Sequence, residues 1–243
     1  MLKRIPGWSR GGPGYGSSGT EHDGWMNHAP HAITARGRAF LIAVVVGLAL
    51  GVFAVLADGI VRWRWFVSLG NLASPWGLAA FLVGLRAESP RRGALVGAVT
   101  LVIGVATYYV GLALRGYVVG EPTVAWTAVA TVAGPIMGLS GAAVSSLRER
   151  PPAVAVAAPS AMLVAESIFF VIDRRVWLYN LRAEPYRLVD LGLVAAFLIG
   201  AMALPPLFVK ERGRRVGAYL IVVSAGVCGA LGFVLLSRVM TSF

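Results

Sequence analysis

One acidic residue lies deep inside an apolar stretch of this chain. Glu166 is the only Asp or Glu well within such a run, about two helical turns before the run ends. Burying an ionised carboxylate in hydrocarbon costs at least about 2.5 kcal/mol, so this side chain must face other helices or a wet cavity, bond to a partner, or stay protonated. Two interpretations stay open. The carboxylate either binds a ligand, cation or proton, or it is a structural anchor, bonded for example to Tyr108, Tyr109 or Asn71.

Proline and polar residues occur together in the apolar run at 65–85. This run contains Asn71, Ser74, Pro75 and Gly77. Because proline lacks a backbone N–H and glycine loosens the next turn, we expect a kink near the middle of this helix. The helix is either simply kinked, or its freed carbonyls line a binding site together with the Asn71 amide and the Ser74 hydroxyl, as in the broken helices of transporters.

Several chemistries are disfavoured by what the apolar runs lack. No run contains histidine, which removes the base of a Ser–His hydrolase, a histidine ligand for haem and the His-Glu-x-x-His zinc site. No run contains lysine, so a retinal Schiff base is not expected. The residues His22, Asp23, His28 and His31 are too loosely spaced to predict a metal site. We therefore expect neither an enzyme nor a cofactor.

The composition requires lipid as a solvent. Hydrophobic residues make up 57% of the chain and charged residues 14%, whereas about 25% are charged in soluble domains. A span needs about 20 mostly apolar residues, and in lipid its backbone must pair internally, so long runs are helices. The expected fold is an all-α polytopic transmembrane bundle with about seven spans, in contact with the lipid bilayer. The runs between charges are 39–57, 65–85, 93–114, 122–147, 151–172, 191–209 and 216–237.

The first 37 residues differ from the remainder of the chain. They include eight Gly, three Pro and all three His, without apolar periodicity. Such a segment cannot bury enough surface to fold alone. We expect a disordered, basic cytoplasmic tail at 1–37 and a transmembrane helical domain at 38–243.

The positions of lysine and arginine predict the orientation. The net charge is +11, carried by short basic clusters between the apolar runs, which is the pattern of membrane-flanking charge rather than of nucleic-acid binding. If the N-terminus lies inside, 14 of the 22 basic residues flank the inner side of the membrane. Since inner loops carry the excess of basic residues, the N-terminus is expected inside.

Small residues form stripes along two of the expected helices. Such stripes let helix backbones approach closely in lipid, where apolar side chains gain nothing by leaving the hydrocarbon. The stripes serve either packing within the chain or docking onto a membrane partner subunit or a second copy. The residues are Gly93, Gly97, Gly104 and Gly111 in the third run, and Ala39, Ala43, Gly47 and Gly51 in the first.

Several segments resemble those of a protein family. The stretches 71–84, 91–97, 106–109 and 133–139 are similar to an uncharacterised family of bacterial multi-pass membrane proteins, over most of residues 38–240. No activity is assigned to that family. The resemblance therefore implies the architecture and a bacterial plasma membrane, and it implies no mechanism.

Two functions from different classes are compatible with these features. The first is a small-solute transporter or solute-binding membrane subunit, with a site between the second, third and fifth runs. The second is a non-transporting scaffold or assembly protein that docks a partner through its small-residue faces. The candidate ligand-binding residues of the first hypothesis are Glu166, Asn71, Ser74, Tyr108 and Tyr109.

Overall fold

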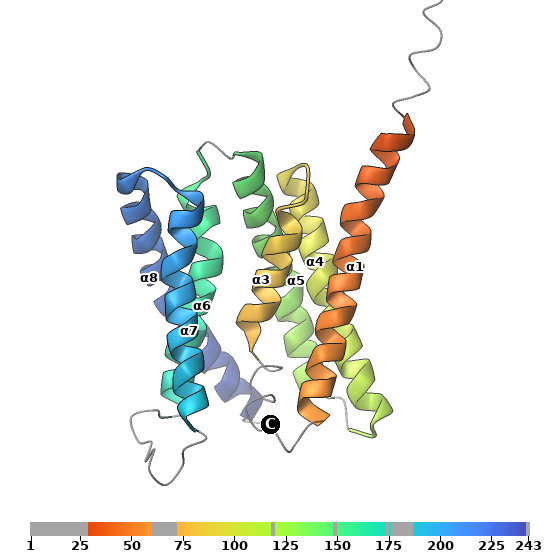
Figure 1. The fold of residues 1–243 in the computed structure, drawn as a ribbon. Coiled ribbons are helices and arrows are strands. Elements are labelled where there is room, and N and C mark those ends of the chain that lie inside the picture. The colour runs from red at the N-terminus through yellow and green to blue at the C-terminus, as the bar shows by residue number, and fades with distance from the viewer. Residues whose placement is uncertain are drawn as a thin grey trace, which may run out of the picture. The chain divides into compact units, whose positions relative to one another are not determined.

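The part of the chain that the structure describes folds into α-helices. The computed structural model describes residues 29–59, 72–117, 120–147, 150–173, 175 and 187–241, and these contain no strand. This confirms the predicted all-α fold. The helices, labelled as in Figure 1, are α1 (Ala29–Gly59), α3 (Ala73–Gly84), α4 (Pro90–Leu114), α5 (Glu121–Ser146), α6 (Ala153–Asp173), α7 (Leu188–Phe208) and α8 (Arg212–Thr241).

Six of the described helices are long and apolar enough to cross a membrane, and α3 is shorter. With 12 residues, α3 is roughly 18 Å long, whereas the hydrocarbon layer is about 30 Å thick. The structure therefore describes six span-length helices where the sequence predicted about seven spans. The first part of the predicted span at 65–85 lies outside the described residues.

Helix α1 begins earlier than the sequence predicted. It starts at Ala29, so 29–37 is helical, although this segment was assigned to the disordered tail. Alanine favours helix, and the proline at the second position of α1 is tolerated in a first turn. The chain divides into two units, Met1–Arg36 and Gly37–Phe243, and the packing described below belongs to the second unit.

Basic residues gather where α3, α5 and α7 end and where α4, α6 and α8 begin. These helix ends lie together at the upper side of Figure 1. This distribution matches the charge pattern from which an inner face was predicted. The N-inside orientation itself stays a prediction. The described basic residues at these helix ends are Arg86, Arg91, Arg92, Arg150, Lys210, Arg212, Arg214 and Arg215.

Glycines bring the backbones of α3, α4 and α5 into contact. A Cβ atom on Gly97 of α4 would collide with the carbonyl oxygen of Gly134 in α5. A Cβ on Gly138 of α5 would collide with the carbonyl oxygen of Gly93, and one on Gly84 of α3 would collide with that of Gly138. Close backbone approach of this kind maximises van der Waals contact between helices in lipid. The glycine stripe of α4 is thus used within the chain.

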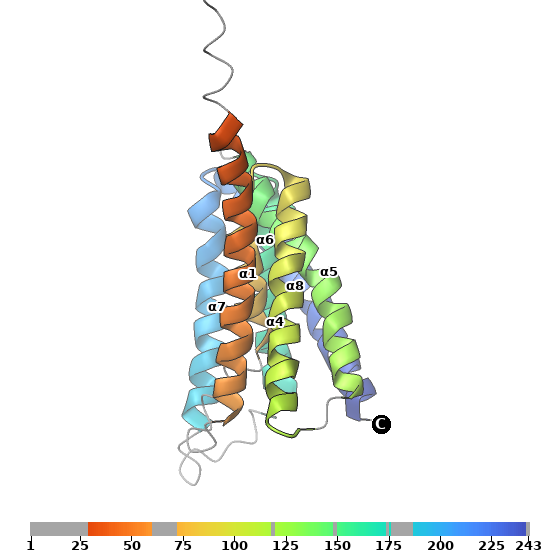
Figure 2. The same cartoon turned by 90° about the vertical axis from the view of Figure 1, so that its right-hand side faces the viewer.

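The small residues of α1 face α4, and Figure 2 shows these two helices side by side. A Cβ on Gly47 or Gly51 would lie 2.6 or 2.5 Å from a carbonyl oxygen of α4. Ala43 is fully buried, and Ala39 packs against the same apolar cluster. Within the predicted line of small residues, Gly47 and Gly51 therefore contact α4, and Ala39 and Ala43 pack into a cluster with residues of α3, α4 and α5.

Large apolar side chains cover the outside of the bundle. Leu41, Val45, Leu220 and Leu231 are each more than half exposed. In the most apolar 18-residue stretch of α7, and likewise of α8, only 17% is buried. An apolar surface of this extent requires contact with the lipid bilayer.

Candidate functional site

The buried carboxylate of Glu166 binds the beginning of α3. Glu166 lies on α6 and is only 4% exposed. Its Oε1 accepts a hydrogen bond from the backbone N–H of Ala73 at 2.6 Å, and its Oε2 accepts one from the N–H of Ser74, also at 2.6 Å. The residue at the N-cap position, Leu72, makes no side-chain capping bond. Glu166 therefore caps α3 from a different helix.

The Glu166 carboxylate pairs backbone N–H groups that would otherwise be unpaired where α3 begins inside the bundle. Glu166 is 7 residues from the end of α6, which places the start of α3 about 10 Å inside that end. The first N–H groups of a helix have no partner within the helix, and in lipid each unpaired group costs several kcal/mol. Both carboxylate oxygens accept an N–H, and the positive end of the helix dipole favours negative charge at this position.

Pro75 has a different role from the one the sequence suggested. We expected this proline to kink a long helix near its middle. In the structure Pro75 is the third residue of α3. Proline is tolerated in the first turn because that N–H would have no partner within the helix. It therefore favours a helix start at this point.

The side chain of Ser74 ties α3 to α6 a second time. It is fully buried, and its hydroxyl donates to the backbone carbonyl of Met162 at 3.4 Å. A Cβ on Gly77, one turn further along α3, would collide with the Met162 sulfur. Helix α3 thus lies directly against the turn of α6 that precedes Glu166.

Tyr108 contacts α1 and not Glu166. Its hydroxyl donates to Asp58 Oδ2 at 2.5 Å. Close by, Arg115 donates from Nη1 to the Val55 carbonyl at 2.7 Å. A Cβ on Gly111 would also meet the Val55 side chain at 2.5 Å. The end of α1 is therefore held to the end of α4 by two hydrogen bonds and a close contact.

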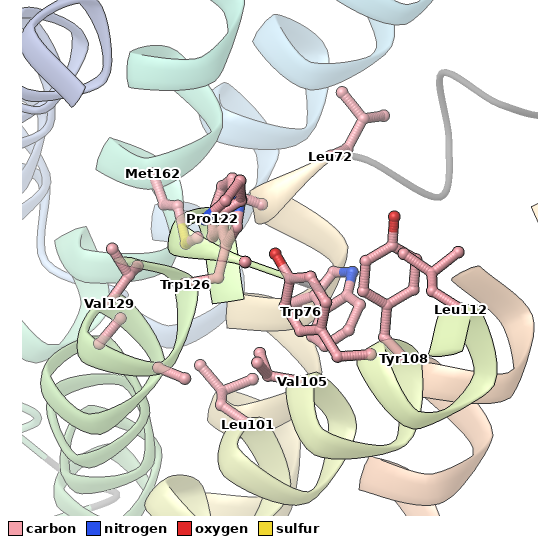
Figure 3. A pocket seen from close by; sticks show the side chains of 15 residues that line it. Leu72, Trp76, Leu101, Val105, Tyr108, Leu112, Pro122, Trp126, Val129 and Met162 are labelled. Carbon is pink, nitrogen blue, oxygen red and sulfur yellow. The ribbon is translucent and has the colours of Figure 1, made fainter. Parts of the chain in front are cut away.

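A cavity of about 330 Å³ lies between α3, α4 and α5 (Figure 3). Its walls are mostly apolar, and four of the side chains are aromatic. Figure 3 shows the rings of Trp76 and Tyr108 close together, and Trp126 on the side of Met162. The lining residues are Leu72, Ala73 and Trp76 at α3; Leu101, Val105, Tyr108, Tyr109 and Leu112 on α4; Gly120, Pro122, Trp126, Val129, Ala130 and Ala133 at α5; and Met162 on α6.

Close contacts position the aromatic rings. A Cβ on Gly104 would lie 2.8 Å from Trp76 Cζ3, so the Trp76 ring rests on α4 where no side chain intervenes. The rings of Tyr108 and Tyr109 meet edge to face, with centroids 5.0 Å apart. This geometry is a favoured one for aromatic pairs.

The structure separates the predicted site residues into two groups. Tyr108 and Tyr109 line the cavity. Glu166 and Ser74 do not line it, but the N–H that Glu166 Oε1 binds belongs to Ala73, a residue of the cavity wall. Asn71 lies outside the described residues.

Sequence reasoning did not select the two tryptophans of the cavity. Trp76 lies within the stretch 71–84 that carried the family resemblance and was given no role, and Trp126 was not singled out. On α4, the lining residues Leu101, Val105 and Tyr108 follow helical spacing, which indicates one face. This spacing does not distinguish a cavity wall from a packed interface.

The fold and the site define the class of protein. The chain is a multi-pass α-helical membrane protein with a half-length helix anchored inside the bundle by a buried carboxylate. It belongs to a family of unknown function, DUF6518, whose family model matches residues 30–242. This confirms the predicted resemblance to an uncharacterised family of multi-pass membrane proteins. No curated protein and no solved structure matches the chain.

Proposed function

We propose that this protein binds a small solute in the cavity between α3, α4 and α5, and that it is a transporter or the solute-binding subunit of one. The observation that carries the proposal is a cavity of about 330 Å³ beside the start of a half-length helix. In transporters, sites are typically formed where helices are interrupted inside the bundle. Following the family resemblance, we place the protein in a bacterial plasma membrane.

The anchoring of α3 supports a preformed site. Ala73 is part of the cavity wall, and its N–H is held by Glu166 of α6. Trp76, one turn later, rests on Gly104 of α4. A wall held from two sides loses little conformational freedom when a ligand binds, which favours affinity.

We also propose that binding here involves no catalysis. All three histidines precede residue 37, and the cavity-lining residues that the structure describes include no acidic or basic side chain. Tyr108, one of the two tyrosines that line the cavity, bonds to Asp58. This set offers shape and aromatic contact to a ligand, and it lacks the nucleophile and base that group transfer requires.

The small-residue faces do not support the alternative function of partner docking. Gly93 and Gly97 of α4 lie against α5, and Gly47 and Gly51 of α1 lie against α4. These faces are occupied within the chain. We therefore propose solute binding and do not propose a scaffold that docks through them.

A cavity-filling substitution tests the proposal. The full-length protein, purified in detergent, is screened by thermal unfolding against metabolites, vitamins and inorganic ions. A ligand at 100 times its Kd should stabilise the fold by about 2.7 kcal/mol. Ala133 lines the cavity, so Ala133→Phe fills it and abolishes the stabilisation.

The matched control is Ala128→Phe. Ala128 lies on the same helix but is exposed on the outside of the bundle, so this variant should keep the full stabilisation. A stabilisation that persists in Ala133→Phe would place the ligand elsewhere. The absence of stabilisation by every compound would count against solute binding.

A further inference from the structure

The aromatic side chains of the cavity come from three different helices. Trp76 belongs to α3, Tyr108 and Tyr109 to α4, and Trp126 to α5. The face of an aromatic ring carries partial negative charge, and tryptophan attracts cations best. Aromatic rings on several sides of one cavity are the arrangement that recognises organic ammonium groups.

A carboxylate lies directly behind this wall. Glu166 binds the N–H groups of Ala73 and Ser74 through its two oxygens, and Ala73 lines the cavity. Within the described part of the chain, the ion pairs Arg92–Glu88 and Arg214–Glu211 are formed elsewhere, and no lysine or arginine pairs with Glu166. The positive end of the α3 dipole favours negative charge on this carboxylate and offsets about half an elementary charge.

Two other charged side chains near the cavity, Asp58 and Arg115, have opposite effects on a bound cation. The Tyr108 hydroxyl donates a hydrogen bond to Asp58 Oδ2, and this bond makes the Tyr108 ring richer in electrons. Arg115 follows the α4 wall and is positive, but its Nη1 is directed to the carbonyl of Val55 in α1. Among the described residues, none of those lining the cavity is basic.

We infer that the solute of this cavity is an organic cation with apolar substituents, of the quaternary ammonium class. This inference rests on the proposed function and names its ligand. The walls desolvate the ligand, which disfavours strongly hydrated inorganic cations because the described lining offers no carboxylate to replace their water. A weakly hydrated ammonium group loses little on entry and gains contact with the rings of Trp76 and Trp126.

Two probes of equal shape and different charge test the inference. Phenyltrimethylammonium is a cation, and tert-butylbenzene is its uncharged carbon isostere. Each is titrated into the full-length protein in lipid nanodiscs, with empty nanodiscs as the correction for partitioning into lipid. A desolvated cation–π site should bind the cation about tenfold more tightly than the isostere.

Substitutions of Trp126 locate the binding. Trp126→Leu should remove most of the preference for the cation, and Trp126→Phe should keep part of it because a smaller ring remains. Phe233→Leu is the control, since this aromatic residue of α8 contacts Phe169 and does not line the cavity. Thermal unfolding of each variant without ligand shows whether the fold is intact.

The outcomes separate this inference from the proposed function. Equal affinity for both probes, lost in Trp126→Leu, would overturn the cation class and leave the solute site in place. Binding of tert-butylbenzene without binding of the cation would also overturn the cation class and leave the solute site in place. Cation binding that Trp126→Leu does not change would overturn the assignment to this cavity. Failure of the cation to bind at millimolar concentration would overturn the inference, while the screen with Ala133→Phe still decides the proposed function.

Discussion

The carboxylate of Glu166 accepts the backbone N–H of Ser74 at 2.6 Å, across 92 positions of the sequence. The same side chain also binds the N–H of Ala73. Through these two bonds α6 determines where α3 begins. The start of α3 is one wall of the cavity, so the anchor and the candidate site form one structural unit.

Loss of the Glu166 charge should destabilise the fold. Glu166→Gln keeps one acceptor oxygen but directs an amide NH₂ toward the other backbone N–H, so one charge-assisted hydrogen bond is lost. We expect a loss of about 2 kcal/mol, and more for Glu166→Ala, which leaves both N–H groups unpaired. Thermal unfolding in detergent measures the change.

Ser74→Ala is the matched control for the Glu166 variants. It removes a hydroxyl that lies 3.4 Å from the Met162 carbonyl and also interacts with the Glu166 carboxylate, and it leaves both backbone N–H groups bound to Glu166. The expected loss is about 1 kcal/mol or less. If Glu166→Gln were as stable as Ser74→Ala, the anchoring role of the carboxylate would be wrong.

The contact of α4 with α5 should tolerate no methyl group. In Gly138→Ala the new Cβ collides with the carbonyl oxygen of Gly93, a backbone atom that cannot move alone. Overpacking of this kind costs about 1–3 kcal/mol. The variant should show a lower unfolding temperature and a lower yield of monodisperse protein in size-exclusion chromatography.

Gly217→Ala provides the comparison for Gly138→Ala. A Cβ on Gly217 of α8 has nothing within 4 Å. Alanine favours helix over glycine by about 1 kcal/mol, so this variant should be as stable as the native protein or more stable. Equal behaviour of the two variants would contradict the close packing of α4 on α5.

Removal of the Tyr108 hydroxyl should loosen α1. Tyr108→Phe keeps the ring and removes the bond to Asp58. Because this bond joins a carboxyl group, we expect a loss of about 1.5–3 kcal/mol in thermal unfolding. Tyr117→Phe, at an exposed position after α4, should change stability little. The prediction fails if the two variants unfold at the same temperature.

Chemical labelling of intact cells tests the orientation. Cys228 is replaced by alanine, and single cysteines are introduced by Tyr117→Cys or by Glu88→Cys. The charge pattern predicts that α4 ends outside and begins inside. A membrane-impermeant maleimide should therefore label Tyr117→Cys and should label Glu88→Cys only after lysis. The reverse pattern would invert the orientation.

The amino-acid sequence alone located the six span-length helices of the described chain, but it did not predict the shorter α3 within the run at 65–85. The run predicted at 93–114 is helix α4, Pro90–Leu114, and the run at 151–172 is α6, Ala153–Asp173. This agreement follows from the solvent: in lipid a long apolar segment must pair its backbone internally, so length and hydropathy suffice. The importance of Glu166 was also readable, because one acidic residue in an apolar run requires a partner.

The tertiary structure decided what the partner of Glu166 is. The sequence suggested side chains such as Tyr108, whereas the carboxylate binds two backbone N–H groups of α3, and Tyr108 bonds to Asp58, 50 positions away. A backbone N–H is present at nearly every residue, so no residue type marks where a helix starts inside the bundle. The cavity likewise depends on how three helices are placed. Apolar residues have the same spacing on a helix face that packs against a neighbour and on one that lines a cavity, so the spacing alone does not predict the cavity.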